Sequence, residues 1–154
     1  MTTFTFNEQV NAPLPDVTPA ALGATTGGAW TNADLGKPVK MGTANNYVLC
    51  ADGDPIEGVL VAIEPFTVND GFPFGTVQKN KRFQAVLDTG ETGVTVGAIV
   101  VAGANAAVGT ANTVANKPVV AVEPTPGDAG DFKWRVIRLI DGGEAGDLVL
   151  IEKI

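Results

Sequence analysis

The stretch from Ala51 to Pro65, ADGDPIEGVLVAIEP, places two aspartates around a glycine directly ahead of an apolar run. Asp-Gly followed by Asp-Pro between two apolar segments is typical of a turn that joins two strands. A calcium loop would need further acidic ligands at fixed spacing, whereas Ile56 stands at the third ligand position and Glu57 follows too closely to close the loop. We therefore interpret Asp52 and Asp54 as turn residues rather than as a metal or catalytic site.

The apolar run after this turn predicts a strand that is buried on both faces. Val59, Val61 and Ile63 point to one side of such a strand, and Leu60 and Ala62 point to the other. A strand without a polar face belongs at the centre of a barrel or sandwich.

Further apolar runs follow at spacings of roughly ten residues, with glycine and proline turns between them. One of the clearest alternations places Phe83, Ala85 and Leu87 on an inward face. The pattern predicts an all-β domain over residues 35–154, either a small β-barrel or a β-sandwich. Residues 104–117 are small, polar and rich in Ala, Asn and Thr, so we expect a long surface loop there.

Residues 1–34 differ in composition from the rest of the chain. Closely spaced prolines fix an extended backbone and remove amide donors, so this segment is expected neither to be helical nor to lie inside a sheet. A single helical turn is the exception we allow, with Thr18 as its cap and Pro19 as its first residue. The segment is interpreted as an extended N-terminal arm that begins with a short strand at Thr3–Asn7. Pairing of this strand with a partner and pairing with its own domain both remain open.

Composition limits the classes of function. The chain has 154 residues, a net charge of −7, a single cysteine, no histidine and no serine. Without histidine it lacks the commonest general base and transition-metal ligand, and Cys50 has no imidazole partner. We therefore expect no enzyme, no metal and no cofactor.

The net charge and the hydropathy pattern also bear on the partners. A negative net charge argues against binding to nucleic acid, which needs a basic face. The sequence shows neither a secretory signal nor an apolar run of about 20 residues, so secretion and insertion into a membrane are not expected. The single cysteine favours a reducing compartment.

Two features of the sequence are candidates for contact with a partner. The glycine-bounded loop NDGFPFG carries Phe72 and Phe74, which either form a small plug under the loop or contact another chain. The cluster KNKR holds Lys79, Lys81 and Arg82, which either meet an acidic patch on a partner or lie in solvent at the start of a strand.

Several of these features together resemble the capsid decoration, or cement, proteins of tailed phages. The features are, in order, the small-residue arm, the segments LGKPVKM and ADGDPIEGVLVAIEP, the loop NDGFPFGTVQ, and a second half rich in Gly, Ala and Val that ends in GDLVLIEKI. The similarity is most specific over residues 35–103 and rests on composition elsewhere. Glu57 precedes the glycine where related turns are often shorter, so the match at this turn is inexact.

The resemblance implies a structural protein that binds the outer surface of a phage head and holds neighbouring capsomers together. Its partner would be the major capsid protein, and it would act as a homo-oligomer, with a trimer favoured and a dimer possible. It would be made in the host cytoplasm and would become part of the virion, on the capsid surface. We assign the contact with the capsid to the arm residues Thr2, Phe4, Phe6 and Val10. The alternatives are another virion β-module associated with a tail or spike, and a small-ligand binder or enzyme that uses the barrel interior.

Overall fold

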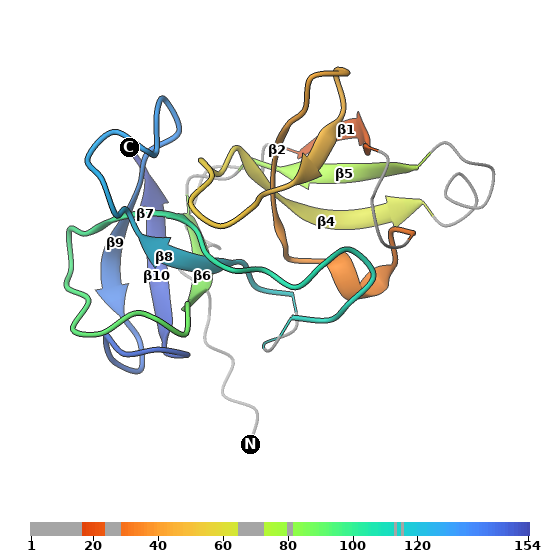
Figure 1. Ribbon diagram of the computed structural model, residues 1–154. Coiled ribbons are helices and arrows are strands. Elements are labelled where there is room, and N and C mark those ends of the chain that lie inside the picture. Colours follow the sequence, from red (N-terminus) through yellow and green to blue (C-terminus); the bar gives the residue numbers. More distant parts are fainter. Residues whose placement is uncertain (1–16, 24–28, 65–72, 80–81, 113, 115) are drawn as a thin grey trace.

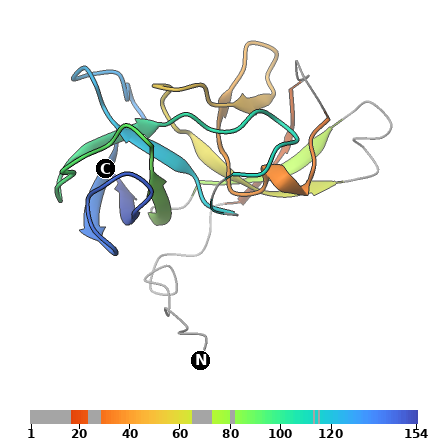
Figure 2. The ribbon, with the colours of Figure 1, turned by 60° about the horizontal axis from the view of Figure 1, so that its bottom comes forward.

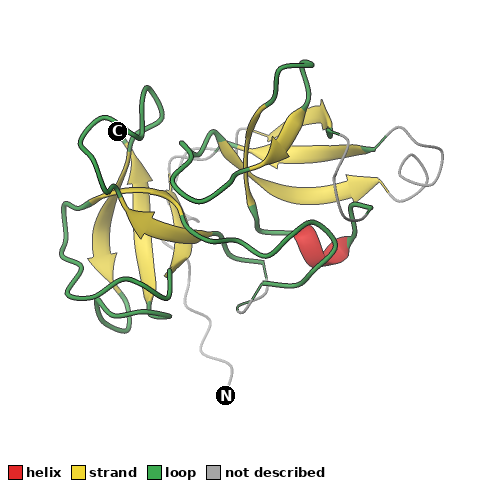
Figure 3. Cartoon of the chain, viewed as in Figure 1, coloured by secondary structure: helices red, strands yellow, loops and turns green. Residues whose placement is uncertain are grey.

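The computed structural model describes residues 17–23, 29–64, 73–79, 82–112, 114 and 116–154. Regular structure in these ranges is nearly all β, which confirms the predicted fold class (Figure 3). The elements are β1 (Val17–Ala21), the 3₁₀ helix η1 (Asn32–Asp34), β2 (Pro38–Met41), β3 (Tyr47–Leu49), β4 (Gly58–Glu64), β5 (Phe74–Gln78), β6 (Arg82–Leu87), β7 (Ile99–Ala102), β8 (Val119–Val122), β9 (Trp134–Leu139) and β10 (Leu148–Lys153).

The first half of the chain forms an antiparallel sheet in the order β1-β5-β4-β2-β3 (Figure 1). The sheet curls until its edges meet, because Leu22 forms a parallel bridge with Tyr47 and the Gly23 amide donates to the Tyr47 carbonyl over 2.7 Å. Its inner face buries one apolar cluster. The members are Ala20, Leu22, Trp30, Val39, Tyr47, Leu60 and Val77.

The second half forms a closed barrel in the order β10-β6-β8-β7-β9, with β9 pairing back onto β10. All neighbours in the barrel are antiparallel except β6 and β8, which run parallel. A barrel of this kind has no open edge. Its interior is filled by side chains from its own strands, from the loop between β6 and β7, from the chain between β3 and β4 and from the start of β4. They are Cys50, Ile56, Val59, Phe83, Ala85, Leu87, Val94, Val100, Ala102, Val120, Trp134, Val136, Val149 and Ile151.

The two units lie side by side and share part of this interior (Figure 2). The segment that follows β3 crosses from the sheet to the barrel, and Ile56 enters the barrel core. Its carbonyl accepts a hydrogen bond of 2.9 Å from the indole nitrogen Nε1 of Trp134, which is fully buried. The barrel interior is therefore completed by residues that the first half of the chain supplies.

The predicted arm over residues 1–34 is wrong for the residues of this range that the structure describes. Strand β1 pairs along its whole length with β5, so the predicted helical turn at Thr18 and Pro19 is absent and a strand takes its place. Trp30 is buried in the sheet core. The folded unit thus extends back to Val17 at least, and residues 1–16 lie outside the described part of the chain.

Proline is accommodated in β1 because the strand lies at the edge of the sheet. The Leu22 amide donates to the Pro73 carbonyl on the β5 side, and amides alternate in direction along a strand. The nitrogen of Pro19 therefore faces away from β5, where no ladder hydrogen bond is lost.

Strand β4 departs from the predicted alternation at a bulge. The register with β5 shifts between Leu60 and Ala62, and Val61 is left 37% exposed instead of buried. Leu60 and Val59 remain buried, in the sheet core and the barrel core respectively. The inward face predicted for Phe83, Ala85 and Leu87 is confirmed, since all three lie in the barrel core.

Candidate binding surfaces and buried polar groups

The turn at Asp52 and Asp54 is a structural turn, as predicted. Gly53 has a φ of 81°, a left-handed conformation that favours glycine, and the Asp54 carboxylate accepts a hydrogen bond of 2.6 Å from the Ala51 amide. The turn also joins the two units, because the Gly53 amide donates to the Ala102 carbonyl and the Ala102 amide donates to the Asp54 carbonyl. The part of the chain that the structure describes holds no group of three or more His, Cys, Asp or Glu side chains that could bind a metal ion.

Cys50 lies just ahead of this turn and is buried in the barrel core. Burial raises the pKa of its thiol far above the ordinary value, and the nearby carboxylate of Asp54 acts in the same direction. The thiol therefore stays protonated at neutral pH, whereas a reactive cysteine needs a thiolate.

The residues predicted to contact a partner are only partly within the described ranges. Some of them lie outside, namely Thr2, Phe4, Phe6, Val10, Phe72 and Lys81. Phe74 lies on β5 rather than in a loop and is 42% exposed, beside Ala21 of β1. Lys79 lies with its Nζ 5.3 Å from the ring centroid of Tyr47. Phe74 and Lys79 stand at opposite ends of β5, about 16 Å apart along the strand, so the structure does not join them into one patch.

Arg82 belongs to a cross-strand row of charges on the outer surface of the barrel. Glu152 of β10 lies opposite Arg82 of β6 on one side and Arg135 of β9 on the other. Its two carboxylate oxygens accept hydrogen bonds from these arginines at 3.0–3.1 Å. The hydrogen bonds from Arg135 and then Arg82 hold the pKa of Glu152 below its usual range. Arg135 could not be predicted as a member of this row from the sequence, because only strand pairing brings it next to Arg82.

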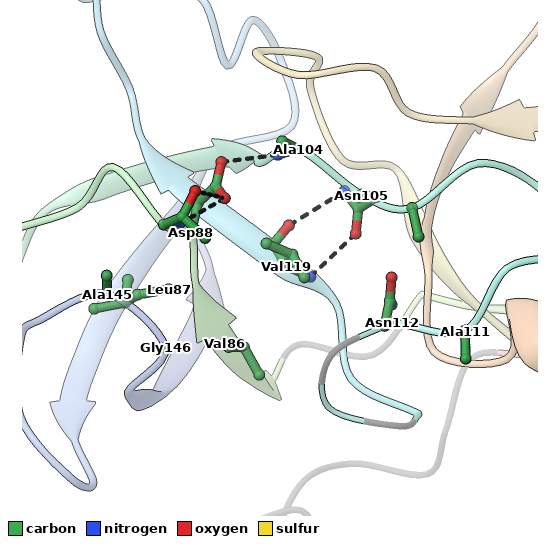
Figure 4. Close-up of a pocket in the computed structure, with 12 residues that line it drawn as sticks. Val86, Leu87, Asp88, Ala104, Asn105, Ala111, Asn112, Val119, Ala145 and Gly146 are labelled. Carbon is green, nitrogen blue, oxygen red and sulfur yellow. Dashed lines mark hydrogen bonds between the residues drawn. The ribbon is translucent and has the colours of Figure 1, made fainter.

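A cavity of about 530 Å³ lies between the barrel and the 104–117 loop (Figure 4). Most of its lining is apolar, and its polar side chains hold the loop in place. The Asp88 carboxylate accepts from the Thr89 and Ala104 amides at 2.6 and 2.9 Å, and Asn105 exchanges hydrogen bonds with the backbone of Val119. Asn112 is nearly buried, and its Oδ1 has no hydrogen-bond partner.

A second set of polar contacts, fully buried, fastens the same loop to the sheet. Lys37 and Asp34 have no exposed side-chain surface, and Nζ of the lysine lies 2.6 Å from Oδ1 of the aspartate. Lys37 Nζ also donates to the carbonyls of Ala107 and Thr110 at 2.8 and 2.7 Å. Asp34 accepts from the Gly109 amide. We call this group the clasp; it satisfies two buried charges and joins η1 to the loop of the other unit.

Near the clasp, the backbone at Gly36 lies very close to the backbone at Asn116. Gly36 has a φ of +86°, and a Cβ at this position would lie 2.1 Å from the carbonyl carbon of Asn116. The loop predicted at residues 104–117 is confirmed, since its described residues form no strand. It is not loosely solvated, however, because it contacts Lys37 and Gly36.

No helix in the described ranges is long and apolar enough to span a bilayer. Comparisons of the chain with protein-family models, with curated proteins and with solved structures find no match.

Proposed function

We propose that this protein is a capsid decoration protein, which binds the major capsid protein on the outer surface of a phage head and stabilises contacts between capsomers. The proposal starts from the resemblance described above. It is supported by the way the molecule uses its buried charges. Among the described residues, Asp34 and Lys37 are the buried charged side chains, and both serve to fasten one β-unit to the other.

A rigid body of this kind suits a protein that attaches to a lattice. Apolar interiors fill both units, and the units are joined through Trp134, Ala102 and the clasp. The polar groups around the cavity of Figure 4 hold the loop through backbone hydrogen bonds. Because closely packed interiors deform little, a body of this kind keeps its shape when it is held to the lattice at one attachment point.

The attachment point that we propose is the segment ahead of β1. Extended segments can add a strand to an exposed sheet edge on a partner and gain backbone hydrogen bonds without a large groove. Strand β1 itself is a poor template for strand addition, since Pro19 offers no amide on its outer edge. The added strand would therefore come from Thr2, Phe4, Phe6 and Val10, and many copies on one shell would compensate for weak binding by each.

The test is removal of residues 1–16, followed by co-sedimentation with purified phage heads. This truncation spares β1, whereas removal of residues 1–20 would destroy it and confuse loss of binding with loss of folding. We expect the truncated protein to keep its circular dichroism spectrum and melting temperature and to lose binding. The double variant Phe4→Ser/Phe6→Ser should bind weakly, and the matched control Thr3→Ser/Thr5→Ser should bind like the parent.

Unchanged binding by the truncated protein would contradict the role of the arm. Failure of the full chain to bind heads at all would contradict the proposed function itself.

A tail- or spike-associated virion module is the second candidate, and one observation favours it. Phe74 is 42% exposed on the outer surface of the sheet, next to Ala21, which is also exposed. Large exposed apolar patches mark contacts with other chains, and in this candidate Phe74 and Ala21 would belong to such a contact. Mass photometry of the pure protein separates the candidates, since large ordered assemblies in the absence of heads favour the tail or spike module.

A further inference from the structure

The barrel carries a cluster of cations where β6 begins and β10 ends. Arg82 and Arg135 flank Glu152, and Lys133 adjoins this row because the Ile154 amide donates to the Lys133 carbonyl over 3.0 Å. Lys153 follows Glu152 on β10, and its Nζ lies 5.1 Å from the ring centroid of Phe132, which precedes Lys133. We call Arg82, Lys133, Arg135 and Lys153 together the basic edge. Against these four cations stand the carboxylates of Glu152 and of Asp131, which lies two residues ahead of Lys133, so the basic edge keeps a positive charge in a protein whose net charge is −7.

The other end of the same strands is acidic. The loops 88–97 and 141–147 are linked there, since the Val94 amide donates to the Gly143 carbonyl over 2.9 Å and the Gly93 amide to a carboxylate oxygen of Glu144 over 3.3 Å. Neither loop contains a lysine or arginine. The carboxylates of this acidic end are Asp88, Glu91, Asp141, Glu144 and Asp147.

The two charged regions are too far apart to neutralise each other within one molecule. Strand β10 runs from Leu148, next to the acidic end, to Lys153 at the basic edge, and Figure 1 shows the C-terminal residue and the β9–β10 loop at opposite ends of the barrel. Six residues of strand span about 20 Å. This distance is more than twice the Debye length at physiological salt, so the two regions do not neutralise each other. The nearby opposite charges within the chain are single residues, Arg138 of β9 beside the acidic end and Asp131 beside the basic edge.

We propose that the basic edge of one copy of this chain docks on the acidic end of a second copy. The two surfaces are complementary in charge, and screening limits the repulsion from the rest of each acidic molecule to short range. They are also complementary in polarity. Ile154 is 55% exposed beside Lys133, and the largely apolar cavity of Figure 4 is lined in part by Asp88 and Gly146, which belong to the loops of the acidic end or adjoin them.

A contact between two different surfaces of one chain is heterologous. Each copy then has one free edge and one free end, and assembly continues until it closes into a ring or grows as an open chain. The inference rests on the proposed function in one respect only, since it supplies the contact within the homo-oligomer. It is measured on pure protein, and its failure leaves binding to heads untouched.

The experiment uses two charge-reversed variants of the full chain. Lys133→Glu/Lys153→Glu reverses part of the basic edge and leaves the arginine pairs of Glu152 in place. Asp141→Lys/Glu144→Lys reverses part of the acidic end, where both side chains are exposed. Analytical ultracentrifugation at low salt should show a self-association constant about tenfold or more weaker for each variant alone.

Mixing the two variants should restore association as mixed pairs, because the unchanged basic edge of the acidic-end variant then meets the unchanged acidic end of the basic-edge variant. The matched control Asp128→Lys/Asp131→Lys makes the same change in net charge as the acidic-end variant, at exposed positions ahead of β9. It should associate at least as well as the parent.

A parent protein that stays monomeric at high micromolar concentration would overturn the proposal. Variants that associate like the parent, or a mixture that stays dissociated, would overturn it as well. Loss of association in the control equal to that in the acidic-end variant would mean that net charge, not this contact, governs assembly.

Discussion

Lys37 stands in the segment LGKPVKM, where the sequence pattern predicts a polar residue at the start of a strand. In the folded protein it is one of the least accessible side chains, held by Asp34 and by two carbonyls that follow far later in the sequence. The sequence does contain a local signal for part of this arrangement, since Thr31 and Asp34 form a capping box. Nothing local predicts the distant carbonyls, because they belong to an irregular loop.

Replacement of Lys37 by methionine should strongly destabilise the protein. The change leaves the Asp34 carboxylate buried and without its counter-charge, which costs about 3–5 kcal/mol in free energy of unfolding. Lys40→Met is the control, since the pair of Lys40 with Asp54 is partly exposed and contributes less than about 1 kcal/mol. Urea denaturation of both variants measures the difference, and equal losses would show that the clasp adds little to stability.

Glu152 should make the stability depend on pH in the acidic range. Its pKa is lower in the folded protein than in the unfolded chain, so its contribution is present above the ordinary carboxyl pKa of about 4.3 and is lost as the pH falls through the lower, folded pKa. The parent should therefore exceed Glu152→Gln in unfolding free energy at pH 7, and the gap should narrow on acidification below about pH 4.3. Urea titrations across this range test it, and a constant gap would contradict it.

At the scale of the elements, the sequence predicts strands where polar and apolar residues alternate regularly, but it does not predict the edge strand β1. Strand β6 was predicted because its inward residues meet one apolar core, which selects for a period of two. Strand β1 was missed because Pro19 normally excludes a strand, and only its edge position makes the proline harmless. Val61 was placed inside because a bulge in β4 leaves no mark in the hydropathy pattern.

The approach of the 3₁₀ helix to the long loop should be sensitive to a single methyl group. Gly36→Ala adds both the strain of a left-handed conformation, about 1–2 kcal/mol, and a clash with the Asn116 backbone, about 1–3 kcal/mol. Gly53→Ala at a φ of +81° has open space around its Cβ and should show the strain alone. Thermal and urea unfolding of the two variants separate the backbone strain from the clash with Asn116. Equal destabilisation of the two variants would argue against a close contact between Gly36 and Asn116.

At the scale of the whole molecule, the two units should unfold together. The barrel core includes Cys50, Ile56 and Val59 from the first half of the chain, so the barrel loses part of its core if the sheet opens. Two interacting units that share a core behave as one cooperative system.

The two tryptophans allow a direct measurement of this cooperativity. Trp30 lies in the sheet core and Trp134 in the barrel core, so Trp134→Phe leaves a probe of the sheet and Trp30→Phe leaves a probe of the barrel. In each variant, fluorescence and far-ultraviolet circular dichroism should give superimposable urea transitions. Separate transitions in either variant would show that the units are independent domains.

The same scale explains why the candidate surfaces were only partly predicted. Arg82 was identified from a run of basic residues, but its neighbours Arg135 and Lys133 are distant in sequence and come together through the pairing of β6, β10 and β9. The acidic end likewise arises from two loops that touch, the loop between β6 and β7 and the hairpin loop between β9 and β10. Short-range patterns reveal strands, whereas surfaces depend on topology.

The clasp also has a consequence during synthesis on the ribosome. Ala107 and Thr110 follow Lys37 by 70 and 73 residues. At translation rates of about 5–20 residues per second, the nascent sheet waits several seconds for the carbonyls that will hold this ammonium group. During that interval Lys37 must stay hydrated at the tunnel mouth, so the first unit can reach its final form only after the second has begun to emerge.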